Sequence, residues 1–107
     1  ELLGPGPDRM LHIVNKSPTD GSAFDSALRL SGSGALLLIE DAVYGATRGN
    51  PAEARVRTAL ERLKIYVLAP DLEARGMADR LTEGVTAVDY GGFVDLVAEH
   101  PNCQSWL

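Results

Sequence analysis

The sequence ALLLIE, at residues 35–40, places five apolar side chains in a row before its glutamate. Successive side chains of a β-strand point to opposite faces of the sheet, so a strand that is apolar at every position needs cover on both faces. Strands of this kind lie in the middle of parallel sheets that carry helices on each side. This run therefore predicts an α/β protein.

Three further short apolar runs accompany it: LHIV at 11–14, KIYVLA at 64–69 and TAVDY at 86–90. Helix-like segments separate the four runs, an alternation that is typical of crossover units and of a mainly parallel sheet. We expect a three-layer α/β sandwich in which about five short helices flank a small, mainly parallel sheet.

The first connection carries clear helix signals. Phe24, Ala27 and Leu28 have the i, i+3, i+4 spacing of one helical face. Gly32 follows at a position suited to ending the helix. We expect a helix with its apolar face on the sheet.

The later connections predict three more helices. In the segment 50–63, Asn50 is expected to cap a helix whose first residue is Pro51. Within 70–76, Asp71 is expected to cap a short helix. The expected buried residues of these segments are Val56, Ala59 or Leu60, Leu63 and Leu72, and those of the last helix, which Pro101 ends, are Phe93, Leu96 and Val97.

The length and charge of the chain exclude several classes of protein. At 107 residues it fits one domain, which we place at 10–107, with 1–9 as a flexible extension or a non-native remnant. A formal net charge of −5 opposes direct nucleic-acid binding. The apolar runs are far shorter than the roughly 20 residues of a membrane span, and a single cysteine forms no intrachain disulfide. We expect a cytoplasmic protein with no membrane role.

The carboxyl ends of the expected strands are the place to look for a ligand, because open parallel sheets bind ligands there. Asp41 is interpreted mainly as a helix cap. The two histidines, His12 and His100, lie on different elements, so we expect no metal site and no cofactor. The expected strand-end cleft contains Lys16, Asp41, Tyr44, Asp71 and Tyr90.

The tail HPNCQSWL, at 100–107, contains the chain's only cysteine and only tryptophan. Cys103 follows the carbonyl end of a helix and has no local base, which disfavours a reactive thiolate. Trp106 and Leu107 are expected to pack on the core or to dock on a neighbouring subunit. No catalytic residue is assigned. An enzyme that needs a partner, a binding module and a structural subunit all remain open.

Five stretches resemble the TusB/DsrH family of bacterial sulfur-relay proteins. They occur in the family's order and cover most of the chain from residue 10 onward: MLHIVNKSP at 10–18, LLLIEDAVYGA at 36–46, LKIYVLAPDLEARG at 63–76, VDYGGFVDL at 88–96 and QSWL at 104–107.

The resemblance implies a DsrE-like fold and a place in a heterohexamer with TusC/DsrF-like and TusD/DsrE-like subunits. The active cysteine would lie on the TusD- or DsrE-like partner, and the sulfur would pass to a TusE- or DsrC-like carrier. This sequence has Ala27 where DsrH proteins of sulfur oxidisers often carry a cysteine, and the family gives Cys103 no role.

The resemblance favours a non-catalytic TusB-like subunit that supports formation of 2-thiouridine at the tRNA wobble position. One alternative is a DsrH-like subunit of the DsrEFH complex in dissimilatory sulfur oxidation, since NKSP and APDLEARG are DsrH-like. Another is a homo-oligomeric module that binds a small ligand. A subunit that normally buries apolar faces against partners is also expected to self-associate when isolated.

Overall fold

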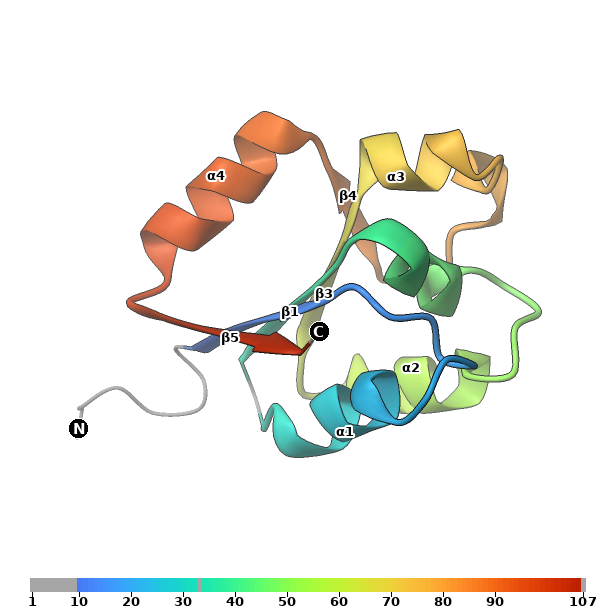
Figure 1. Cartoon of the computed structure of the whole chain (residues 1–107), viewed down its shortest axis with the longest axis horizontal. Helices are drawn as coiled ribbons and strands as arrows, with labels where there is room; N and C mark the ends of the chain where they lie inside the picture. The colour runs from blue at the N-terminus through green and yellow to red at the C-terminus, as the bar shows by residue number, and fades with distance from the viewer. Residues whose placement is uncertain (1–9, 33, 107) are drawn as a thin grey trace.

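A computed structural model describes residues 10–32 and 34–106 (Figure 1). Its five strands form one sheet in which every pairing is parallel, in the order β4-β3-β2-β1-β5. The strands are β1 (Met10–Val14), β2 (Ala35–Leu38), β3 (Lys64–Leu68), β4 (Thr86–Val88) and β5 (Asn102–Trp106).

Helices cover both faces of this sheet, which confirms the expected three-layer α/β architecture. In Figure 1, α4 lies on one side of the sheet and α1 and α2 lie on the other. The helices are α1 (Ala23–Leu30), η2 (Glu40–Ala46), α2 (Glu53–Ala59), α3 (Ala69–Ala74), η3 (Ala78–Arg80) and α4 (Tyr90–Glu99), of which η2 and η3 are 3₁₀ helices.

The larger core lies between the sheet and the layer that contains α1, η2, α2 and α3. Phe24, Ala27 and Leu28 all face this core, as their spacing predicted. Gly32 follows α1 with φ of +65°, the left-handed conformation that glycine adopts most readily after a helix. The strands add Val14, Leu36, Leu38, Ile65 and Val67 to the core.

The opposite face of the sheet has thinner cover. Its fully buried residues are few, and α4 contributes only Leu96 to them. Phe93 of α4 is half-buried, and so is Tyr66 on β3. Val97, which was expected to face the sheet, is instead 41% exposed. One helix therefore covers this face incompletely.

The tail of the chain forms β5, a strand that the sequence pattern did not predict. It pairs with β1 in parallel register, from Met10 opposite Asn102 to Val14 opposite Trp106. Four of the five β5 side chains are exposed, so the strand has no apolar alternation to mark it. The expected sheet of four strands was one strand short.

Two of the expected helix caps were wrong. Asp41 lies inside η2, after the cap position Ile39, and caps nothing. Asp71 lies within α3, which starts directly from β3 at Ala69. Helix α2 begins at Glu53, two residues after Pro51, although the Asn50 side chain still accepts a hydrogen bond from the Ala52 N–H at 2.6 Å.

The strand limits also differ slightly from the apolar runs. The run at 35–40 was expected to be a strand throughout, but β2 ends at Leu38 and η2 begins at Glu40. The proposed extension at 1–9 lies outside the described residues, so the division of the chain at Met10 stays a prediction.

Candidate functional site

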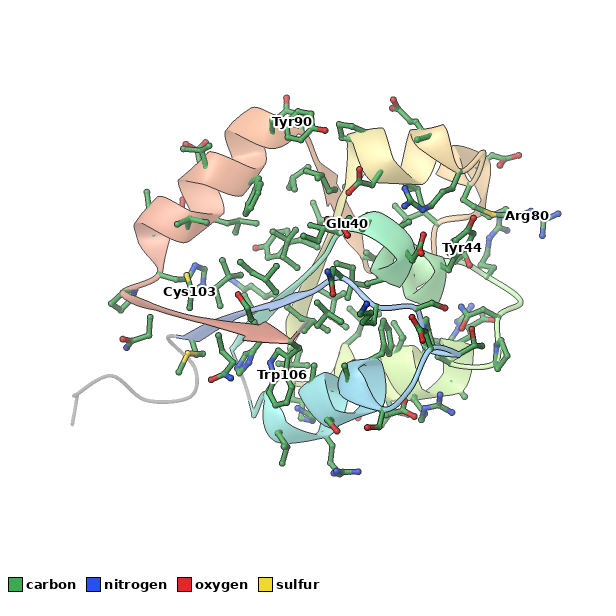
Figure 2. The ribbon with its side chains drawn as sticks, in the orientation of Figure 1. Glu40, Tyr44, Arg80, Tyr90, Cys103 and Trp106 are labelled. Carbon is green, nitrogen blue, oxygen red and sulfur yellow. The ribbon has the colours of Figure 1, made fainter. Side chains whose placement is uncertain are left out.

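The tail is fixed to the sheet through Trp106. Its indole packs against the larger core, and its Nε1–H donates a hydrogen bond of 3.0 Å to Nδ1 of His12 on β1. The centroids of the two rings are 6.1 Å apart. Figure 2 shows Trp106 at the end of β5, beneath the sheet. Leu107, the second expected packing residue, lies outside the described residues.

The burial of His12 makes the stability of the fold depend on pH. Burial lowers the pKa of His12 below its ordinary value of 6.5, so the folded protein favours the neutral ring. Since Nδ1 accepts from Trp106, a second proton on the ring would remove that hydrogen bond. The stabilisation is fully present above pH 6.5 and is lost as the pH falls through the lowered pKa.

We therefore expect the melting temperature to fall as the pH drops from about 6.5 to about 5.5, before most carboxylates titrate. Differential scanning calorimetry across this range measures the effect. His12→Gln should remove most of the dependence, and the matched control His100→Gln should keep it. An identical dependence in His12→Gln would show that another group is responsible.

A polar cluster lies at the carboxyl ends of the central strands. The backbone N–H of Glu40 donates to Oδ2 of Asp71 at 2.6 Å, which joins the ends of β2 and β3. The Asn15 amide, just after β1, makes a long contact of 3.5 Å with Oε1 of Glu40. Oδ1 of Asn15 is buried without a hydrogen-bond partner among the described residues.

Arg75 joins two of the expected cleft residues. Its Nε and Nη2 lie 3.0 Å and 2.9 Å from Oδ1 of Asp41. Its Nη1 donates a hydrogen bond of 3.0 Å to the backbone oxygen of Asp71. Arg75 therefore contacts both residues, Asp41 through its side chain and Asp71 through its backbone oxygen. An exposed ion pair of this kind contributes at most about 1 kcal/mol.

The other expected cleft residues do not join this cluster. Tyr44 lines a separate pocket of about 300 Å³ together with Pro18 and Pro51. Lys16 is exposed in the loop after β1. Figure 2 shows Tyr90 at the start of α4, well away from both Glu40 and Tyr44, and its side chain is 59% exposed. The structure thus divides the five residues among several places.

The sequence interpretation gave no role to Glu40 or Arg75. Glu40 ends the apolar run at 35–40, and its φ of +51° turns the chain into η2. It is the only non-glycine residue with positive φ among those the structure describes. The one local signal for Arg75 was its spacing from Asp71, four residues earlier, at the end of the same expected helix.

The conformation of Glu40 is strained, because the left-handed region costs an ordinary residue about 1–2 kcal/mol. We expect Glu40→Gly to raise the free energy of unfolding by about 0.5–1 kcal/mol, after allowance for the greater freedom of glycine in the unfolded chain. Urea denaturation measures the change. Glu40→Ala keeps the strain and is the matched control; equal stabilities of the two variants would contradict this account.

The described residues supply no metal centre: they contain no group of three or more histidine, cysteine, aspartate or glutamate side chains able to hold a metal ion. Cys103 is exposed on β5, in register with Leu11 of β1. Over the part of the chain that the structure covers, none of the helices has the length and apolar character needed to span a membrane.

Fold and cluster together define a class: a small parallel α/β protein whose strand-end carboxylates are engaged by an arginine and by backbone groups. The fold is shared with the ychN protein from E. coli, with a TM-score of 0.80 at 16% identity over 90% of this chain and 97% of that one. A protein of unknown function from Methanobacterium thermoautotrophicum gives a TM-score of 0.70 at 20% identity, over 90% of this chain and 96% of the other.

Sequence comparison narrows the class to a family. Residues 16–103 match the family described as DsrH like protein. Protein TusB of Pectobacterium parmentieri is 38% identical over 91% of this chain and 100% of its own length. Protein TusB of Escherichia coli K12 has the same identity and coverage. The chain belongs to the TusB/DsrH family, as its motifs predicted.

Proposed function

We propose that this chain is a non-catalytic, TusB-like subunit of a cytoplasmic sulfur-relay complex that supports 2-thiouridine formation at the tRNA wobble position. The observation that carries the proposal is the 38% identity to TusB proteins along their entire length. Full coverage matters because no part of the relatives is missing from the match.

The surroundings of Ala27 and Cys103 support a non-catalytic role. A sulfur carrier needs an accessible thiolate that is stabilised by a cation, a base or a helix N-terminus. Ala27, at the place where some relatives are expected to carry a cysteine, is fully buried in the core. Cys103 follows α4 on an exposed edge strand, at the end of the helix that carries partial negative charge.

The proposed partners are TusC- and TusD-like chains in a heterohexamer, with the persulfide cysteine on the TusD-like subunit and a TusE-like carrier as acceptor. Direct contact with tRNA is not part of the proposal, since the chain has a formal charge of −5. The thinly covered face of the sheet beneath α4 offers apolar surface for such an assembly.

Complementation tests this role. We expect the chain to restore 2-thiouridine in the tRNA of an E. coli strain that lacks its own TusB, measured by mass spectrometry of tRNA nucleosides. E. coli TusB is the positive control. Cys103→Ser should restore the nucleoside to within about twofold of the unchanged chain; a complete loss in that variant would show that Cys103 carries sulfur.

The alternative role is a DsrH-like subunit in dissimilatory sulfur oxidation, which the DsrH-like stretches NKSP at 15–18 and APDLEARG at 69–76 favour. Co-expression with TusC and TusD in one arm, and with DsrF and DsrE in the other, separates the two roles. Recovery of a stable complex only with the Dsr chains would support sulfur oxidation. A complex with neither pair would count against both roles.

A further inference from the structure

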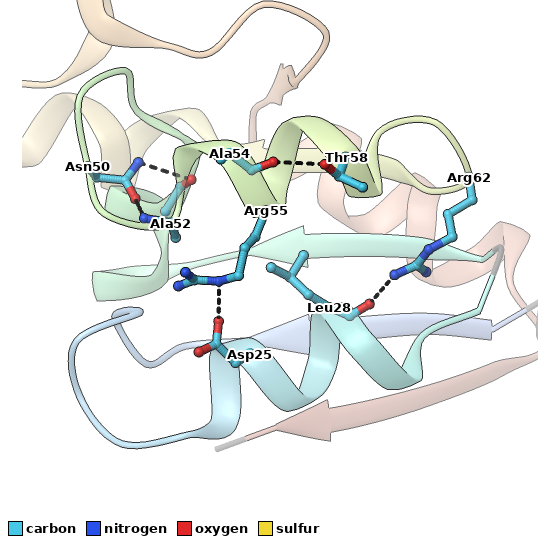
Figure 3. A network of polar contacts seen from close by, with 9 residues as sticks. Asp25, Leu28, Asn50, Ala52, Ala54, Arg55, Thr58 and Arg62 are labelled. Carbon is cyan, nitrogen blue, oxygen red and sulfur yellow. Dashed lines mark hydrogen bonds and ion pairs between the residues drawn. The ribbon is translucent and has the colours of Figure 1, made fainter.

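The layer opposite α4 contains an apolar groove between α1 and α2. It has a volume of about 470 Å³, and its lining includes Leu28, Ala54 and Ala59. Arginines bridge the two helices around it (Figure 3): Arg55 pairs with Asp25 at 2.9 Å, and Arg62 donates to the Leu28 backbone oxygen at 2.6 Å. These two contacts tie α2 and the turn that follows it to α1.

The rim of this groove is basic, unlike the chain as a whole. Three arginines line it, Arg29, Arg55 and Arg62, and Asp25 is the only acidic residue in the lining. The whole chain has a formal charge of −5. A partner for this groove should therefore present an apolar stripe beside negative charge.

Helix α4 presents such a surface. Tyr90, Val94 and Val97 are 59%, 65% and 41% exposed, and their i, i+4, i+7 spacing puts them on one face of the helix. Asp95 and Glu99 are exposed on the same helix, which contains no lysine or arginine. The helix is thus apolar and acidic on the surface that it turns away from the sheet.

We propose that α4 of one copy docks into the α1–α2 groove of a second copy of this chain. The two surfaces are complementary in charge, and Ala54, the exposed small residue of the groove lining, leaves room for the Val94 side chain. They lie on opposite faces of the sheet, so the contact is head to tail and leaves a free α4 and a free groove at the two ends of each pair (Figure 1).

One helix in one groove buries less area than the 1,200 Å² or more that is typical of stable interfaces. The association of the isolated chain is therefore weak and depends on concentration. It is independent of the proposed sulfur-relay role, because it uses only this chain's own surfaces and is measured without partner subunits or tRNA.

Sedimentation velocity of the isolated chain tests the contact. Val94→Asp places a charge on the α4 stripe, and Ala54→Glu places one in the groove. Each variant should weaken self-association by about tenfold or more. Ala78→Glu adds the same charge on η3, outside both surfaces, and should leave it unchanged. Circular dichroism melts verify that all three variants fold.

A mixture of the two defective variants gives the decisive result. Val94→Asp keeps an intact groove and Ala54→Glu keeps an intact α4, so an equimolar mixture should form a one-to-one dimer that does not extend. A contact between two α4 helices would leave the mixture no more associated than the variants alone, and that result would overturn the proposal. So would an unchanged chain that stays monomeric up to about 1 mM.

Discussion

Replacement of Trp106 by alanine is expected to lower the free energy of unfolding by about 2–3 kcal/mol and the melting temperature by about 10–15 °C. A fully buried tryptophan costs about 3–5 kcal/mol when truncated, and Trp106 is only partly buried. The substitution also removes the hydrogen bond to His12, which leaves a buried imidazole nitrogen without its donor. Thermal and urea denaturation of the isolated chain measure the loss.

Trp106→Phe separates the two contributions. Phenylalanine keeps most of the apolar contact with the core but has no N–H to donate to His12, so it should lose only about 1 kcal/mol. It should also weaken the dependence of stability on pH, because His12 no longer needs a free Nδ1. Equal stability of the alanine variant and the unchanged chain would mean that Trp106 does not anchor β5.

Gly45→Ala is expected to destabilise the fold by about 2–3 kcal/mol. Gly45 lies in η2 against the ring of Phe24, and a Cβ built at this position overlaps two ring carbons. Phe24 is 1% exposed, so its ring has no free space into which it could move. The φ of Gly45 is not in the left-handed region, so the cost comes from the lack of space alone.

A double mutant tests this cause directly. Phe24→Leu shortens the side chain opposite Gly45 and should cost about 1 kcal/mol by itself. In that background Gly45→Ala should lose at least about 1 kcal/mol less than it does in the unchanged chain, because the clash is relieved. Strict additivity of the two substitutions in urea denaturation would exclude the clash as the cause.

The sequence predicted the parts of this fold that bury apolar side chains in a regular pattern. The run at 35–40 identified the central strand, and the spacing of Phe24, Ala27 and Leu28 identified the buried face of α1. These patterns are local, because each depends only on the repeat of a strand or helix and on which side chains must leave water. The motifs shared with the TusB/DsrH family then predicted the class of protein.

The parts that the sequence did not predict depend on contacts between distant residues. Strand β5 is uncharged and largely exposed, and only the partner strand β1 makes it a strand. Asp71 has the residue type of a helix cap, but it accepts from the Glu40 N–H across 31 positions of the chain. The local sequence pattern predicts neither this hydrogen bond nor the positive φ of Glu40.

The pairing of β1 with β5 also has a consequence for the rate of folding. It joins the first and last strands of the described chain, so a long loop must close before its hydrogen bonds form. We expect β5 to attach after the transition state, and Trp106→Ala should then speed unfolding while hardly changing the refolding rate. Until β5 attaches, the backbone groups on the outer edge of β1 have no partner strand. Partly folded chains aggregate through unpaired strand edges of this kind.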